Sequence, residues 1–327
     1  MLLSYRNKMI LISLCCTAFS LPITAASISP QEKDADRTIT RLYHSQQHKP
    51  TKDLSSKTVF MSQQFLQTPY LLTALGEGLE SQYDQFPLYR TDGFDCETYV
   101  DTVIALALSN DLRQFKRCIN KVRYDKGAIS YINRNHFTCL DWNKNNQKQG
   151  FTKDITRSFH DNQERSVAVL ASAYIDKPSW YQHKTIDTIR LEKGDINRRE
   201  QRLIALKKEA RHLPKTMSTI PYIPFSVLFD KNGNANQAVF QQIPNAAIIE
   251  IIRPNWDLVK AIGTHLNVSH LGFAIWKNND LFFRNASSIH KQVIDVPLID
   301  YLREAQKSPT IKGINVQILM TDAHCGS

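Results

Sequence analysis

Three residues far apart in the sequence, Cys96, His270 and Asn285, are of the types that together form a cysteine nucleophile, its base and an orienting amide. In such a set the thiolate attacks a carbonyl carbon, the imidazole transfers the proton, and the amide holds the imidazole in the required tautomer. The prediction depends on whether the elements that carry these residues bring them together in space.

Cys96 stands at the start of an amphipathic helix predicted for TDGFDCETYVDTVIALAL, residues 91–108. The apolar residues of this segment recur every three or four positions and form one stripe. Asp95 is a typical N-cap residue, and Thr98 follows three positions later. Cys96 therefore lies in the first turn, where free backbone N–H groups and the helix dipole favour a thiolate. The alternative is an inert cysteine that serves as a small apolar residue of a buried helix.

His270 and Asn285 lie on two segments predicted to form a β-hairpin. LNVSHLGFAIW, residues 266–276, and LFFRNAS, residues 281–287, both have the alternation of a strand, and the tract KNND between them is typical of a turn. Pairing across this turn makes His270 and Asn285 diagonal neighbours on one face. Gly272 beside them leaves space over the imidazole ring. A histidine alone on a strand is more often structural, so the neighbouring amide and the upstream cysteine carry the prediction of a Cys–His–Asn set.

The first 26 residues have the features of a secretory signal peptide. Arg6 and Lys8 precede an apolar run, and the small residues Ala25 and Ala26 form a cleavage site. The run is too short for a transmembrane helix, and no later segment approaches the length of about 18 apolar residues that a span requires. We therefore predict a protein that is exported to the periplasm or secreted, without a membrane span.

The charge of the chain indicates anionic partners. Lys and Arg number 41 against 31 Asp and Glu, a net charge of +10, which falls to +8 when the predicted signal peptide takes away two cations. A basic exported protein suits partners such as cell-wall polymer. The sequence has no zinc-finger spacing and no basic helix with interleaved aromatic residues, so nucleic acid is not an expected partner.

Four cysteines follow the predicted signal peptide: Cys96, Cys118, Cys139 and Cys325. Cysteines of exported proteins tend to pair. If Cys96 stays free to react, at most one disulfide forms among the other three, and the sequence leaves its pairing open. No cysteine or histidine has metal-ligand spacing, so neither a metal nor another cofactor is predicted.

The predicted elements change character along the chain. Residues 27–90 are expected to be helical and polar, residues 111–122 to form another helix, and residues 194–212 a basic helix. The last third is rich in short β-branched and alternating segments separated by turn residues. We therefore predict an α+β protein with a mainly helical subdomain over 27–215 and a small antiparallel β subdomain over 216–327.

Two segments of the first half remain open on the sequence alone. Residues 165–175 fit a strand or a buried helix equally well. Residues 123–156 combine turn residues with a concentration of aromatic and basic side chains, Tyr131, Arg134, His136, Phe137 and Trp142. This composition indicates either a binding surface or a polar loop that its aromatic residues anchor in the core.

Three blocks of the chain, in the same order, resemble the AmiA-like N-acetylmuramoyl-L-alanine amidase family. They are FDCETYVDTVIALAL, then ISYINRNHFTCLDW followed by KDIT, then NVSHLGFAI with RNASS. The resemblance covers about residues 35–320. The family belongs with the papain-like cell-wall cysteine hydrolases of the NlpC type. This relationship implies a papain-like fold whose helical subdomain carries the cysteine and whose antiparallel, barrel-like β subdomain carries the histidine.

The resemblance also implies roles for individual residues. Cys96 matches the nucleophile of the family, and His270, with Ser269 before it, matches the block that contains the base. Asn285 stands where the family usually has a histidine, so the orienting residue is expected to be an amide here. Glu97 stands where the family tends to have threonine, and a carboxylate there opposes thiolate formation unless it points to solvent.

The implied substrate is peptidoglycan or its muropeptides, cleaved at the N-acetylmuramoyl-L-alanine link. Arg134, His136 and Trp142 match a block expected to contact substrate, with Arg134 pairing with a stem-peptide carboxylate and Trp142 packing against sugar or peptide. Ser269 is also expected to contact the substrate. One alternative is an endopeptidase that cuts the γ-D-glutamyl–diaminopimelate bond. An alternative of another class is a catalytically inactive envelope protein that binds the cell wall. The sequence does not determine the oligomeric state, and a monomer is assumed.

Overall fold

The computed structural model describes residues 28–48, 50–192, 196–323 and 325–326, and the predicted signal peptide lies outside them. The helices are α1 (Pro30–His48), α2 (Leu54–Gln63), α3 (Cys96–Ala107), α4 (Leu112–Arg123), α5 (Asn143–Lys148), α6 (Lys177–Gln182), α7 (Ile196–Glu209), α8 (Phe225–Leu228), α9 (Gln237–Phe240), α10 (Val259–Ile262) and α11 (Leu298–Ala305). The strands are β1 (Thr152–Asp154), β2 (Val169–Asp176), β3 (Lys215–Pro224), β4 (Ile248–Asp257), β5 (His265–Lys277), β6 (Asp280–Ser287), β7 (Gln292–Pro297) and β8 (Gly313–Leu319).

The strands of the described residues form an eight-stranded antiparallel sheet in the order β2-β3-β8-β4-β5-β6-β7, with β1 added to β8. The predicted α+β class is therefore confirmed. Within the described part of the chain no pairing joins β2 to β7, so the barrel-like closure expected from the resemblance is not observed. Because β1 and β2 precede residue 215, the sheet also crosses the predicted boundary between a helical and a β subdomain.

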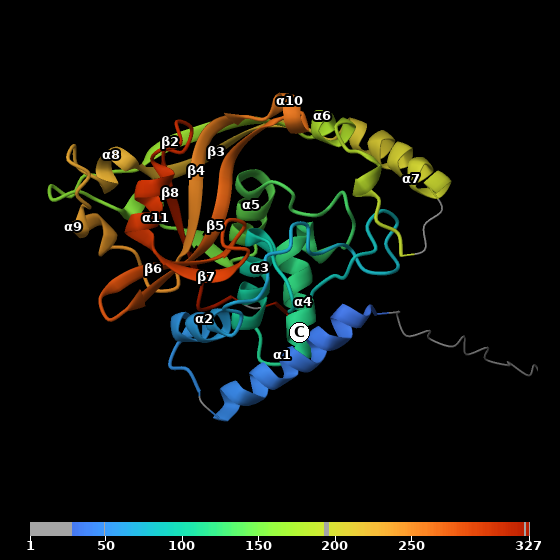
Figure 1. Cartoon of the computed structure of the whole chain (residues 1–327), viewed down its shortest axis with the longest axis horizontal. Helices are drawn as coiled ribbons and strands as arrows, with labels where there is room; N and C mark the ends of the chain where they lie inside the picture. The colour runs from blue at the N-terminus through green and yellow to red at the C-terminus, as the bar shows by residue number, and fades with distance from the viewer. Residues whose placement is uncertain (1–27, 49, 193–195, 324, 327) are drawn as a thin grey trace, which may run out of the picture.

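Helices cover both faces of this sheet (Figure 1). On one face α3 packs against β5 and β6, and on the other α11 packs against β6 and β7. Side chains of β4 point alternately to the two faces of the sheet, and each face has its own hydrophobic core. Ile248 belongs to the core beneath α3, whereas Ile249 and Ile251 belong to the core beneath α8, α9 and α11. A strand that is buried on both faces must be apolar at successive positions, which explains the run AAIIEII.

Several predicted elements are confirmed and one is wrong in part. The helix predicted over 111–122 is α4, the basic helix over 194–212 contains α7, and the ambiguous segment 165–175 contains all of strand β2 except its last residue. Residues 64–95, however, form turns and isolated bridges rather than helix. Their backbone groups bond to each other across the segment, as in Leu71 N–H to the Phe94 carbonyl at 2.8 Å, which leaves them unavailable for a helical ladder.

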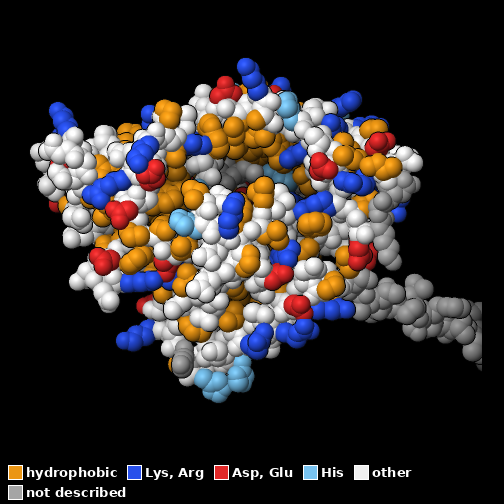
Figure 2. Space-filling model, viewed as in Figure 1, with side chains coloured by type: hydrophobic (Ala, Val, Ile, Leu, Met, Phe, Trp, Pro, Cys, Tyr) orange, Lys and Arg blue, Asp and Glu red, His pale blue; other side chains and the backbone are white. Residues whose placement is uncertain are grey.

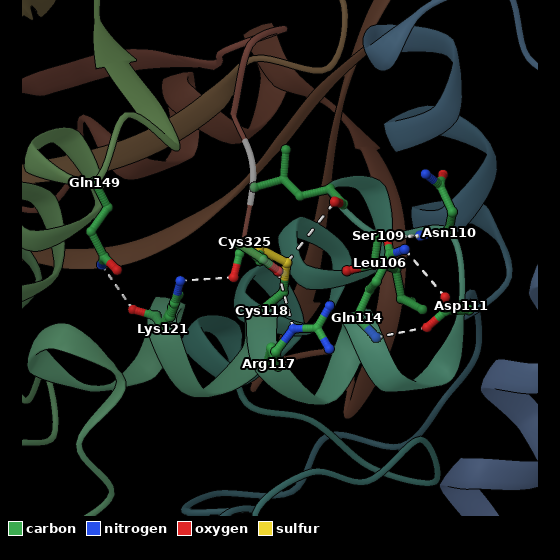
Figure 3. Close-up of a disulfide and its surroundings, with 12 residues drawn as sticks. Leu106, Ser109, Asn110, Asp111, Gln114, Arg117, Cys118, Lys121, Gln149 and Cys325 are labelled. Carbon is green, nitrogen blue, oxygen red and sulfur yellow. Dashed lines mark hydrogen bonds between the residues drawn. A yellow bond between two sulfur atoms is a disulfide. The ribbon is translucent and has the colours of Figure 1, made fainter.

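A disulfide between Cys118 and Cys325 ties the C-terminal segment to α4 (Figure 3). Lys121 donates to the Cys325 carbonyl at 2.7 Å, and Arg117 donates to the Gly326 carbonyl at 3.1 Å. The expectation of at most one disulfide is confirmed for the described residues, in which Cys96 and Cys139 are free.

We expect the double variant Cys118→Ser/Cys325→Ser to lose about 2–5 kcal/mol of unfolding free energy. The bond closes a loop across a sequence separation of 207 residues, so it removes much chain entropy from the unfolded state. Urea denaturation measures the change. Reductant should destabilise the wild type to the same extent and leave the double variant unaffected. Equal stability of the oxidised wild type and the variant would contradict the prediction.

Candidate active site

Cys96 is the first residue of α3, as predicted, and a capping box holds this helix start in place. The Asp95 carboxylate accepts the Thr98 N–H at 2.9 Å, and the Thr98 hydroxyl accepts the Asp95 N–H at 3.0 Å. The first-turn N–H groups around the sulfur therefore belong to a well-capped helix whose remaining residues are almost all buried. A change in the cap would move the sulfur, because its backbone position is set by this turn.

The predicted hairpin carries His270 and Asn285, and its register is confirmed. β5 pairs with β6 through Phe273 opposite Arg284 and Lys277 opposite Asp280. At Gly272 a Cβ would lie only 2.5 Å from the Arg284 carbonyl oxygen. Only glycine therefore allows the two strands to approach this closely beside His270.

The imidazole of His270 bonds to the amide of Asn285, with 2.9 Å between Nε2 and Oδ1. Asn285 in turn donates from Nδ2 to the Phe283 carbonyl at 3.2 Å, which fixes which end of the amide faces the ring. Because Oδ1 can only accept, the proton resides on Nε2 and Nδ1 is left as the basic nitrogen. The sequence prediction that these two side chains meet is thus confirmed.

The packing of α3 against β5 brings the cysteine to this hairpin. The backbone N–H of Leu271, the residue after His270, and that of Glu97 lie close enough to the Cys96 sulfur to lower the pKa of its thiol. Cys96 therefore lies next to the residue that follows His270, where the start of α3 adjoins the middle of β5.

The electrostatic state of Cys96 differs from the sequence-based expectation. Burial raises the pKa of the thiol, and the carboxylates of Asp95 and Glu97 raise it further, whereas the N–H groups of Leu271 and Glu97 lower it. The effects that raise the pKa outweigh those that lower it, so the resting Cys96 side chain is a neutral thiol. The helix start alone would favour a thiolate, but burial next to acidic side chains reverses this preference.

Glu97 is half-buried and does not extend freely into solvent. Burial raises the pKa of its carboxyl well above the usual range; Asp101 and Asp95 raise it further, and Arg123 lowers it. This shift favours the protonated form of Glu97, which repels a thiolate at Cys96 less than the carboxylate does.

Two tyrosines that sequence reasoning did not single out adjoin the site. Tyr301 of α11 stacks on the His270 ring, with 6.3 Å between centroids and 27° between planes. The pKa of Tyr301 is raised by its burial and then by Cys96, and the same two causes raise the pKa of Tyr70 to about 12. No sequence signal marks either residue, because neither lies in a recognisable motif and both reach the site through the tertiary fold.

His270 is partly buried, and this burial lowers the pKa of its imidazole whereas the bond to Asn285 raises it. Phe283 lies nearly perpendicular to the ring at 5.7 Å between centroids. Ser269, which precedes His270, donates to the Ile251 carbonyl at 3.4 Å. Ser269 therefore contributes to the pairing of β5 with β4 in this structure.

Arg134 and His136 lie in a polar and aromatic cluster. Arg134 donates from Nε to Glu77 at 2.6 Å and from a terminal nitrogen to Asp84 at 3.0 Å. His136 bonds through Nε2 to the Tyr131 carbonyl at 2.7 Å, and burial lowers the pKa of its ring well below the usual range. The guanidinium of Arg134 is thus already paired with two carboxylates, and a substrate carboxylate would have to compete with them.

Trp142 is a core residue of this structure. Its side chain is fully buried, and its indole Nε1 donates to Asp101 at 2.6 Å. The packing against sugar or peptide that the sequence predicted for Trp142 finds no support in this position. Of the two interpretations of residues 123–156, anchoring in the core applies to Trp142 and also to Phe137, which is 2% exposed.

The face shown in Figure 2 is hollowed near its centre, with hydrophobic side chains along its upper edge and Lys and Arg side chains beside it. In the described part of the chain no group of three or more His, Cys, Asp or Glu side chains is placed to hold a metal ion. The helices among the described residues include none that is long and apolar enough to cross a membrane.

The fold and these contacts define an α+β protein with a helix-start cysteine next to a strand histidine and its amide partner. The model of the family described as AmiA-like, N-acetylmuramoyl-L-alanine amidase-like, matches residues 60–311. The chain belongs to this family, which confirms the resemblance inferred from its three sequence blocks.

Several solved structures are similar to this chain. A protein from Legionella pneumophila is 53% identical, with a TM-score of 0.87 over 89% of this chain and 96% of the other. An N-acetylmuramoyl-L-alanine amidase from Bacteroides uniformis is 23% identical, with a TM-score of 0.57 over 82% of this chain and 99% of the other, and shares the fold. A putative xylanase from Bacteroides fragilis is 22% identical with a TM-score of 0.53, over 79% and 98% of the two chains. No curated protein matches the chain.

Proposed function

We propose that this protein is an exported, papain-like cysteine hydrolase of peptidoglycan that cleaves the N-acetylmuramoyl-L-alanine link. The observation that carries the proposal is the position of Cys96 beside the strand that holds the His270–Asn285 pair. The Leu271 N–H is close enough to the Cys96 sulfur to lower the pKa of its thiol, and His270 Nε2 bonds to Asn285 at 2.9 Å. Membership of the AmiA-like family supports peptidoglycan as the substrate and the N-acetylmuramoyl-L-alanine link as the bond that is cleaved.

In the proposed mechanism His270 acts as a general base. Because the Cys96 thiol is neutral at rest, its proton passes to Nδ1 of His270 as the sulfur attacks the amide carbonyl carbon. The Cys96 backbone N–H, one of the first-turn groups that no helix carbonyl accepts, is a donor for the developing oxyanion. The imidazolium then protonates the leaving nitrogen, the C–N bond breaks, and a thioester joins the muramoyl acyl group to Cys96.

Deacylation completes the cycle. His270 removes a proton from a water molecule, the resulting hydroxide attacks the thioester, and the carboxylic acid departs as the thiol is restored. Asn285 keeps the proton on Nε2 throughout, so that Nδ1 alternates between base and acid. Protonated Glu97 reduces the unfavourable charge that a carboxylate would place beside the transient thiolate.

Digestion of purified peptidoglycan tests this function. We expect mass spectrometry to find free stem peptides and intact glycan strands, with none of these products from the Cys96→Ala variant. Stem peptides cut between γ-D-glutamate and diaminopimelate would instead identify an endopeptidase. Binding to the wall without any product that depends on Cys96 would identify an inactive wall-binding protein and overturn the proposal.

A further inference from the structure

A cavity of about 500 Å³ lies where the start of α1 and the end of α7 meet the segments 77–83 and 129–132. Its volume falls within the range of about 300–1,000 Å³ that is usual for small-molecule sites. The described residues that line it do not include Cys96, His270 or Asn285, so the cavity is not part of the proposed catalytic set.

The cavity is acidic although the chain is strongly basic. Four glutamates line it, Glu32, Glu77, Glu80 and Glu209, and no lysine or arginine is among the described residues of its lining. The whole chain, in contrast, has a formal net charge of +10. Carboxylates of one sign around a hollow focus a negative potential inside it. The cavity therefore favours a cationic ligand.

Glu77 has an acceptor atom that the described residues do not satisfy. Its side chain is 1% exposed, and its Oε1 accepts from Arg134 Nε at 2.6 Å. Its Oε2 is buried and has no hydrogen-bond partner in the described part of the chain. Burial raises the pKa of Glu77 more than Arg134 lowers it, so one guanidinium does not offset the cost of burying this carboxyl. A cationic N–H donor in the cavity would supply what is missing.

Two of the other carboxylates are held in place by neutral donors. Glu32 accepts the backbone N–H of Ser29 at 2.7 Å and that of Leu88 at 3.0 Å. Glu209 accepts the hydroxyl of Tyr83 at 2.8 Å. Such bonds fix the positions of the carboxylates without cancelling their charge, so the negative potential persists in a preformed arrangement.

The remaining walls indicate an organic cation rather than a metal ion. Tyr83 and Tyr131 line the cavity and meet edge to face, with 6.4 Å between their ring centroids. Aromatic rings of this kind attract ammonium groups. The apolar part of the lining can pack against a hydrocarbon chain and comprises Ile28, Leu79, Leu88, Ile129 and Ile132. No group of three or more His, Cys, Asp or Glu side chains among the described residues is placed to hold a metal ion.

We propose that this cavity binds an organic ammonium group with an aliphatic body, with Glu77 as its buried acceptor. Binding here is independent of the reaction proposed above. The ammonium has two possible sources. One is a free aliphatic amine. The other is the chain itself, because cleavage of the predicted signal peptide after Ala26 would create an α-amino group on Ser27, the residue before Ile28 of the lining.

The test is calorimetry with 1,5-diaminopentane and its neutral isostere 1,5-pentanediol on the mature chain, residues 27–327, with its α-amino group either free or acetylated. We expect the acetylated chain to bind the diamine about tenfold or more tightly than the diol, since hydrogen bonds to charged groups contribute on this scale. Equal diamine binding by the free chain would identify an external amine as the ligand. Diamine binding only after acetylation, with a lower melting temperature, would identify the α-amino group of the chain. A diamine that binds the acetylated chain no better than the diol would overturn the proposal.

Variants of the lining test the same site. Glu77→Gln removes the buried charge at constant size and should weaken diamine binding about tenfold or more. Should that variant fold poorly, Glu80→Gln with Glu209→Gln changes exposed members of the lining and should weaken binding about two- to fivefold. Glu200→Gln is the matched control, because Glu200 is exposed on α7 and lies outside the lining. Unchanged binding in the folded lining variants, or an equal loss in the control, would contradict the site.

Discussion

We expect the Cys96→Ala variant to lose hydrolysis of muropeptides by about 10⁴-fold or more. Alanine removes the atom that forms the thioester and leaves the fold intact, because Cys96 makes its contacts at the first turn of a helix that a capping box already holds. Loss of a nucleophile in a hydrolase has effects of this size or larger. Initial rates on a purified muropeptide, followed by chromatography of the released peptide, measure the change.

Cys139→Ala is the matched control for this substitution. Cys139 is the other free cysteine among the described residues, is 5% exposed and interacts with Ser218 at 3.1 Å. Burial raises the pKa of its thiol to about 11, so it stays protonated and unreactive. The Cys139→Ala variant should therefore hydrolyse the muropeptide at a rate within about threefold of the wild type. Activity of Cys96→Ala within tenfold of the wild type, with unchanged circular dichroism, would exclude a mechanism through this cysteine.

The substitution His270→Gln should lower kcat by on the order of 10³- to 10⁶-fold, as loss of a catalytic base does. Glutamine fits the enclosed space beside Tyr301 and can still bond to Asn285, but it accepts no proton at neutral pH. His212→Gln, at an exposed position, is the control and should retain full activity. Comparable losses in both variants would indicate a general effect on the protein rather than loss of a base.

The pH dependence of the wild type provides an independent test of His270. Burial lowers the pKa of its imidazole below the ordinary value of 6.5, and a base functions only while it is unprotonated. kcat/KM should therefore be constant near neutral pH and fall as the pH drops through a midpoint below 6.5. The raised pKa of Cys96 means that a resting thiolate does not set this limb. An acid-side midpoint above 7 would exclude His270 as the group responsible.

The local elements of the site were predictable because short-range rules determine them. Asp95 and Thr98 specify a helix start by hydrogen bonds over three residues, and they place Cys96 in the first turn whatever surrounds it. The turn at Asn278–Asn279 has positive φ at both residues, and it sets the register that joins His270 to Asn285. The family, too, was recognisable from three blocks of residues.

The tertiary structure alone decided the features that depend on contacts distant in sequence. Burial and neighbouring carboxylates raise the pKa of Cys96, which makes it a neutral thiol, and also raise the pKa of Glu97; the helix start by itself would not indicate either shift. Residues 64–95 and strand β2 follow from pairing with remote segments, and the choice of Cys325 as the partner of Cys118 follows from where the chain ends against α4.

Two aromatic residues show most clearly the difference between what the sequence indicates and what the tertiary structure decides. Trp142 had the chemistry of a sugar-binding residue, yet the packing of its segment beside α3 buries it against Asp101. Tyr301 had no distinguishing feature in the sequence, yet α11 places it on the His270 ring. Residue type and spacing indicated the candidate reacting groups and the elements that carry them. Burial and charge, which sum over contacts from the whole chain, decided their protonation and which side chains surround them.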